Sequence, residues 1–226
     1  MGIPGIAKAF MNEISEIKLP EVKGFKMIKP ESDITLSDAK NFVEKLFEKL
    51  FNETNDGFYT DYKDRRDRTP VDSENGKWEG EPGESKFIPS DKTEKGRAAI
   101  DKLSEYGMNG IEYKNCEPDY SKCCEATVQI DNMTASRYKN FDQADKKLAE
   151  QWSNEKKFGQ EKWTDEDIEK YRKENNLSWH ERCDTKTMDL VSRDIHGGDT
   201  SVFLHSGGVA ECKARDEKNI GGGFDE

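Results

Sequence analysis

The feature that most constrains the fold is a hairpin pattern near the C-terminus. Leu177 to Cys183 predicts a strand, Asp184 to Lys186 a tight turn, and Thr187 to Val191 the returning strand. Serine is a favourable helix N-cap, so Ser192 is expected to begin a short helix that carries His196. The stretch therefore predicts two antiparallel strands followed by a helix.

Alternation along the first predicted strand separates its side chains. Trp179 and Glu181 face one side of the strand and His180 faces the other. If Trp179 lies in the core, His180 projects from the opposite face, where the following helix can bring His196 near it. His180 and Glu181 then reach one site only if the strand is bulged.

All three histidines of the chain, His180, His196 and His205, lie in its last 47 residues. Imidazole is the commonest transition-metal ligand, and its pKa suits general-base catalysis near neutral pH. The clustering predicts a metal or catalytic site. The alternative is a structural zinc, or a polar hairpin with three unrelated surface histidines.

Composition limits the core and the partners. Of the 226 residues, 32% are hydrophobic and 37% charged, and the net charge is −11. About 45–50% apolar residues is usual, so thin cores are expected in one large or two small domains. The acidity argues against a protein that coats nucleic acid, but allows an enzyme that uses a metal and a local basic patch.

Neither a membrane span nor a secretory signal is expected. No run of about 20 apolar residues occurs. The first residues lack the basic and long apolar regions of a signal peptide. Export by a general signal peptide is therefore not expected, although delivery by specialised machinery would need none.

The five cysteines form no CxxC pair, which argues against a zinc ribbon. Free thiols in a reducing compartment are expected. A mixed histidine site with Cys183 and Cys212 is disfavoured by their wide separation.

Hydrophobic periodicity and capping residues predict the remaining elements. Thr164 with Asp167 predicts a capping pair for the last of these helices. The expected helices cover residues 38–53, 93–106, 141–152 and 165–175, and the expected strands cover 110–114 and 126–131.

The C-terminal motif resembles a known nuclease family. Trp179-His180-Glu181, then Lys186 to Val191, His196 and His205-Ser206-Gly207-Gly208 are similar to the WHH branch of the HNH/endonuclease VII superfamily, the His-Me finger nucleases. Members of that branch are mostly C-terminal toxin domains of bacterial polymorphic toxins, each inhibited by a cognate immunity protein. The motif covers about thirty residues, so residues 1–150 inherit nothing from the resemblance.

The resemblance implies phosphodiester cleavage with a divalent ion, Mg²⁺, Mn²⁺, Ni²⁺ or Zn²⁺. One reading makes His180 the general base and His196 and His205 the metal ligands, with Glu181 assisting the metal. The other makes His180 a ligand and lets another group, such as Glu181, activate water. The candidate phosphate contacts are Arg182, Lys186 and Arg193.

Two departures from the family pattern bear on these roles. Many members have a second histidine where this chain has Glu181. The nine-residue step from His196 to His205 turns a straight helix by about two and a half turns, which puts the two on opposite faces. Gly197-Gly198 would have to break the helix and let residues 199–204 loop back for both to bind one metal.

Together these features predict an α+β protein with a helical N-terminal portion and a C-terminal ββα-metal nuclease core. The expected divisions are a linker or arm (1–30), a helix-rich α+β portion (31–150), the nuclease core (151–220) and a flexible tail (221–226). The expected function is an endonuclease toxin, delivered into the target-cell cytoplasm and acting on DNA, with RNA cleavage as a variant. The alternative is a non-catalytic binding module with a structural metal.

Overall fold

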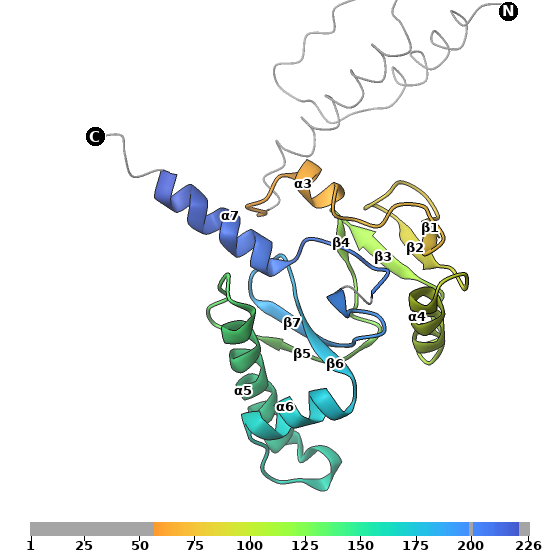
Figure 1. The fold of residues 1–226 in the computed structure, drawn as a ribbon. Helices are drawn as coiled ribbons and strands as arrows, with labels where there is room; N and C mark the ends of the chain where they lie inside the picture. The colour runs from red at the N-terminus through yellow and green to blue at the C-terminus, as the bar shows by residue number, and fades with distance from the viewer. Residues whose placement is uncertain (1–56, 199–200, 222–226) are drawn as a thin grey trace, which may run out of the picture. The chain divides into compact units, whose positions relative to one another are not determined.

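The computed structural model describes residues 57–198 and 201–221, which form an α+β arrangement of two small antiparallel sheets with flanking helices (Figure 1). The arm predicted at 1–30 and the helix predicted at 38–53 lie outside the described residues, as does the tail after residue 221. None of the described helices has the length and apolar character needed to cross a membrane.

The first sheet has four strands in the order β1-β2-β3-β4. It follows the short helix α3 (Tyr62–Arg66), and helix α4 (Glu94–Ser104) separates β2 from β3. Thr93 caps α4 by accepting a hydrogen bond from the Gly96 amide, as serine and threonine do at N-termini. The strands are β1 (Gly76–Trp78), β2 (Lys86–Pro89), β3 (Ile111–Lys114) and β4 (Glu117–Pro118).

The second sheet contains the predicted hairpin. Its strands are β5 (Cys124–Gln129), β6 (Leu177–Glu181) and β7 (Thr187–Ser192), and β7 is central. In the antiparallel register of β6 and β7, His180 lies opposite Asp189. The tight turn between them includes Thr185 in the left-handed region, at φ 57. The strand–turn–strand prediction is therefore confirmed.

Helices α5 (Arg137–Glu155) and α6 (Asp165–Glu174) cover one face of this sheet, joined through the short 3-10 helix η1 (Lys157–Gly159) (Figure 1). The predicted capping pair is confirmed, because Thr164 and Asp167 bond each other's backbone amides at the start of α6. The core on this face is made mainly by Leu148, Trp152, Ile168, Leu177, Trp179, Met188 and Leu190.

The opposite face of the sheet is also covered. Val191 of β7 belongs to a second core cluster, which includes residues of β2, β3 and α4 and of the segment after β7, among them Ile195 and Phe203. Every residue of β7 is consequently buried. A side chain that points away from the α5–α6 face, such as His180, is therefore also enclosed.

The expectation of a short helix from Ser192 is wrong. The amides of Ile195 and His196 both donate to the Ser192 carbonyl, which makes a single turn. Gly198 then has a φ of 60, outside the right-handed helical region. Among the described residues, the next α-helix after the hairpin is α7 (Gly208–Gly221), which begins only after His205.

Sequence reasoning also missed strands β1, β2 and β4. They are two to four residues long, too short for alternation to stand out from the turn-rich composition around them. The sheet of β5, β6 and β7 takes strands from both sides of the division predicted between residues 150 and 151. The domain limits themselves stay predictions.

Glu211 ties α7 to the chain before α3. Its buried carboxylate accepts hydrogen bonds from the amides of Tyr59 (2.5 Å) and Thr60 (3.1 Å), and from the Thr60 hydroxyl. Two segments about 150 residues apart in sequence are thus held together by one carboxylate.

A buried ion pair fixes α5, α6 and β6 to one another. Asp145 of α5 accepts from Arg172 of α6, with Nε at 2.7 Å and Nη2 at 2.5 Å, and from the indole of Trp179 at 2.8 Å. Burial raises the pKa of Asp145, and the hydrogen bonds from Arg172 and Trp179 oppose that effect. The fold depends on keeping this carboxylate paired, because an unpaired buried charge is strongly unfavourable.

We expect Asp145→Ala to lower the free energy of unfolding by about 3–5 kcal/mol, since it leaves the buried Arg172 guanidinium without its partner. Denaturant unfolding followed by circular dichroism measures the change. The control is Glu169→Ala in the exposed pair with Lys173, where the loss should be below about 1 kcal/mol. Equal losses in the two variants would contradict the structural role given to Asp145.

Candidate metal centre

Three histidines from separate segments converge on one point. His180 comes from β6, His196 from the turn after β7, and His205 from the loop before α7. One ring nitrogen of each lies within 4.8 Å of the others. The ring centroids are 4.9 Å apart for His180–His196 and His180–His205, and 5.3 Å apart for His196–His205.

The ring of His205 is oriented by a backbone carbonyl. Its Nδ1 lies 3.0 Å from the Phe203 carbonyl oxygen, which can only accept, so Nδ1 carries the proton. Its Nε2 therefore presents a lone pair, 3.2 Å from Nδ1 of His180. A carbonyl behind a ligating imidazole is the usual way in which proteins fix its tautomer.

Tyr120 packs against all three imidazoles. The ring centroids of Tyr120 and the histidines are 4.8 Å apart for His180, 5.5 Å for His196 and 6.1 Å for His205, in edge-on arrangements. Tyr120 is fully buried, and its hydroxyl donates to the Phe203 carbonyl. It forms an apolar wall that holds the rings in place.

Burial sets the protonation state of the cluster. It lowers the pKa of His180 and His196 well below the usual value, with the neighbouring imidazoles adding to the effect. Burial also lowers the pKa of His205, to about 4, although its hydrogen bond to Phe203 opposes the shift. All three rings are therefore neutral at pH 7, the form that binds a metal.

The cluster fits a divalent transition metal. His180 Nε2 and His196 Nδ1 are buried and have no hydrogen-bond partner. Buried polar atoms are nearly always satisfied, so such atoms indicate a ligand. Three neutral imidazole donors suit Zn²⁺ or Ni²⁺ better than Mg²⁺, which prefers oxygen. No carboxylate or thiolate of residues 57–198 and 201–221 joins this group.

Glu181 lies on the other side of β6 from His180, as the predicted alternation required. Its carboxylate is almost fully buried and accepts from Asn140 Nδ2 at 2.8 Å and Arg137 Nε at 3.1 Å. The structure therefore does not bring Glu181 into the histidine group. Its predicted roles in metal binding and catalysis stay predictions.

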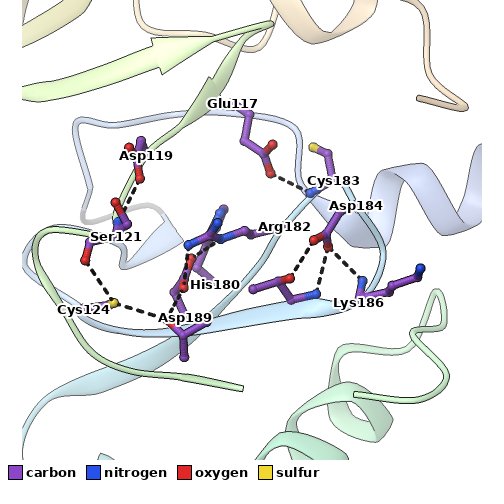
Figure 2. Close-up of polar contacts among 12 residues, drawn as sticks. Glu117, Asp119, Ser121, Cys124, His180, Arg182, Cys183, Asp184, Lys186 and Asp189 are labelled. Atoms are coloured by element: carbon purple, nitrogen blue, oxygen red, sulfur yellow. Dashed lines mark hydrogen bonds and ion pairs between the residues drawn. The ribbon is translucent and has the colours of Figure 1, made fainter. Parts of the chain in front are cut away.

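The three basic candidates for phosphate binding occupy different environments. Arg182 donates through Nε at 2.6 Å and Nη2 at 2.9 Å to the fully buried Asp189, as Figure 2 shows. Lys186 is exposed at the hairpin turn, where its amide donates to Asp184. Arg193 is exposed just after β7, and its charge is one of the causes that lower the pKa of His196.

All five cysteines are free thiols. Cys183 donates to the Ser206 carbonyl and Cys212 to the Met133 carbonyl. Burial raises the pKa of both thiols, which disfavours the thiolate that a metal requires. The mixed cysteine–histidine site, already disfavoured by the sequence, is not formed by the described residues.

Sequence reasoning missed three residues around the cluster, Tyr120, Arg137 and Asn140. The first lies between β4 and β5, and the other two begin α5. All are more than 39 residues from His180, so no local motif connects them to it. The helix predicted here began at residue 141, so the sequence pattern assigned neither Arg137 nor Asn140 to an element, whereas α5 begins at Arg137.

Part of the chain that contains this site matches a known protein family. Residues 110–207, fewer than half of the chain, match the family described as the DNase/tRNase domain of colicin-like bacteriocin. The matched region contains β3 to β7 and all three histidines. No curated protein matches the chain. The family match supports a nuclease toxin domain of the bacteriocin type in this chain.

We expect Arg182→Ala to lower the free energy of unfolding by about 3 kcal/mol, because it leaves the Asp189 carboxylate buried without its counter-ion. Lys186→Ala removes an exposed charge from the same hairpin and should change stability by less than about 0.5 kcal/mol. Denaturant titration compares the two. Unchanged stability in Arg182→Ala would mean that Arg182 is not a structural anchor.

Proposed function

We propose that this chain is a metal-dependent endonuclease toxin whose ion is held by His180, His196 and His205. The observation that carries the proposal is the convergence of three neutral imidazoles, two with unpartnered buried nitrogens, inside the region that matches a nuclease family. A divalent ion there supplies a Lewis acid for the scissile phosphodiester and for water.

The geometry favours His180 as a metal ligand over His180 as the general base. His180 is fully buried, and its Nδ1 faces the lone pair of His205. A general base needs a path to the attacking water, whereas a ligand needs only the ion. Glu181 is poorly placed to act as the base, because its carboxylate lies outside the histidine group and is engaged by Asn140 and Arg137.

We propose DNA as the main substrate and RNA as the variant. The family description includes both DNase and tRNase domains, so family membership alone does not separate the two. The resemblance of the C-terminal motif to His-Me finger toxins favours DNA. An RNase would be recognised by cleavage of transfer RNA without cleavage of duplex DNA.

A toxin of this class needs an inhibitor in the cell that makes it. We propose a cognate immunity protein as a partner and delivery to the target-cell cytoplasm as the route. Co-expression with the product of the adjacent reading frame should restore growth and allow both proteins to be purified together. Growth inhibition that no neighbouring product relieves would count against the partner.

We expect His180→Ala to weaken zinc binding on the order of a hundredfold, because it removes one of three ligands from a buried site. Calorimetric titration of the purified, folded variant measures the affinity, and Lys186→Ala serves as the control with unchanged binding. The general-base role predicts the opposite pattern, with zinc affinity kept and cleavage lost.

Wild-type protein should cleave plasmid DNA when supplied with Mg²⁺, Mn²⁺, Ni²⁺ or Zn²⁺, and EDTA should stop the reaction. His196→Ala and His205→Ala should lower the rate by at least about a hundredfold. Gel analysis of plasmid and transfer RNA in parallel identifies the substrate. If neither plasmid DNA nor transfer RNA is cleaved with any of the four metals, the second function is favoured, a binding module with a structural metal.

A further inference from the structure

An arginine from α5 contacts the end of β6, the strand that carries His180. Arg137 is the first residue of α5, yet its Nε lies 3.1 Å from the carboxylate of Glu181, the strand neighbour of His180. Its charge is the one cationic influence common to all three imidazoles, whose pKa values it helps to lower. Arg137 is therefore held beside the strand residue that follows His180, although it lies 43 residues before His180 in the sequence.

The support behind this arginine is rigid. Glu181 is 4% exposed and accepts from the buried Asn140 amide at 2.8 Å. Asn140 is fixed in turn by Thr134, since its Oδ1 accepts from the Thr134 amide and its Nδ2 donates to the Thr134 carbonyl. The carboxylate that holds Arg137 is thus itself held by Asn140, which Thr134 fixes in turn.

The other end of the guanidinium faces solvent. The Arg137 side chain is 67% exposed, and only its Nε donates to a residue in the described part of the chain. Both Nη groups are consequently available to an anion. An arginine fixed along one edge offers its remaining donors to phosphate at a small entropic cost, and its planar fork suits two phosphate oxygens.

Arg182 and Lys186 are less well placed for this role. Arg182 donates hydrogen bonds from its Nε and Nη2 to the buried Asp189. Lys186 lies at the exposed hairpin turn. In a chain with a net charge of −11, a phosphate near the histidines needs local positive charge. Arg137 supplies that charge and also neutralises Glu181, which would otherwise repel the substrate.

We propose that Arg137 binds a non-bridging oxygen of the phosphate at the histidine site, and that Glu181 is the positioning residue that holds its guanidinium. This inference rests on the proposed function and names the phosphate-binding group of that site. It also gives Glu181 a role other than metal ligand or base.

The test separates phosphate binding from metal binding. Anisotropy of a labelled 20-base-pair duplex, in EDTA and at several salt concentrations, gives the salt dependence of binding. For Arg137→Ala we expect the slope of log K against log salt to become less negative by about 0.9, the value for one lost phosphate contact. We also expect kcat/KM in the presence of metal to fall about a hundredfold. Zinc affinity should stay within about twofold, since Arg137 is not a ligand.

Three further variants sharpen the result. Arg137→Lys should restore the salt slope but only part of kcat, because lysine lacks the planar fork. Glu181→Gln should keep zinc affinity and lower kcat more than it raises KM. Arg97→Ala, which removes the same charge from exposed α4, is the control and should match wild type. Thermal unfolding confirms that each variant is folded.

The outcomes are distinct. If wild type binds and cleaves while Arg137→Ala has the same salt slope and kcat/KM, the Arg137 proposal is wrong and the proposed function stands. A large loss of zinc affinity in Glu181→Gln would make Glu181 a ligand and overturn its positioning role. Wild-type protein that neither binds nor cleaves nucleic acid would overturn both proposals.

Discussion

The alternation of side chains along β6 is the constraint on which the rest of the site depends. Trp179 points into the core under α5 and α6, where its indole N–H donates a hydrogen bond to Asp145. His180 points to the opposite side and meets the two other histidines. Glu181 returns to the first side and holds Arg137. A one-residue slip of this strand would exchange all three environments at once.

The second requirement is that both faces of the sheet be covered. If the face that carries His180 were open to water, its imidazole would keep an ordinary pKa and a mobile ring. The segment after β7 closes this face, with Ile195 and Phe203 in the core and His196 and His205 directed at His180. An apolar-poor chain thus uses its limited core on both sides of the strands that carry the chemistry.

Local patterns in the sequence were enough to predict the hairpin and the capping pair of α6. They also predicted that the three histidines lie close together. The local pattern gave the wrong structure for the segment after Ser192, where several backbone conformations fit the sequence. Ser192 is a good cap, but Gly197-Gly198 and the buried Ile195 favour a turn and a returning loop, which brings His205 to the site without a helix. Arg137, Asn140 and Tyr120 reach the site only through tertiary packing, which no spacing in the sequence encodes.

The link made by Glu211 has a consequence for how such a domain can be moved between proteins. Its partners, Tyr59 and Thr60, precede the region that matches the nuclease family, and Glu211 itself follows it. A cassette cut at residues 110 and 207 would discard both sides of this link. A segment that keeps this link intact must therefore run from residue 59 to residue 211, beyond the matched region at both ends.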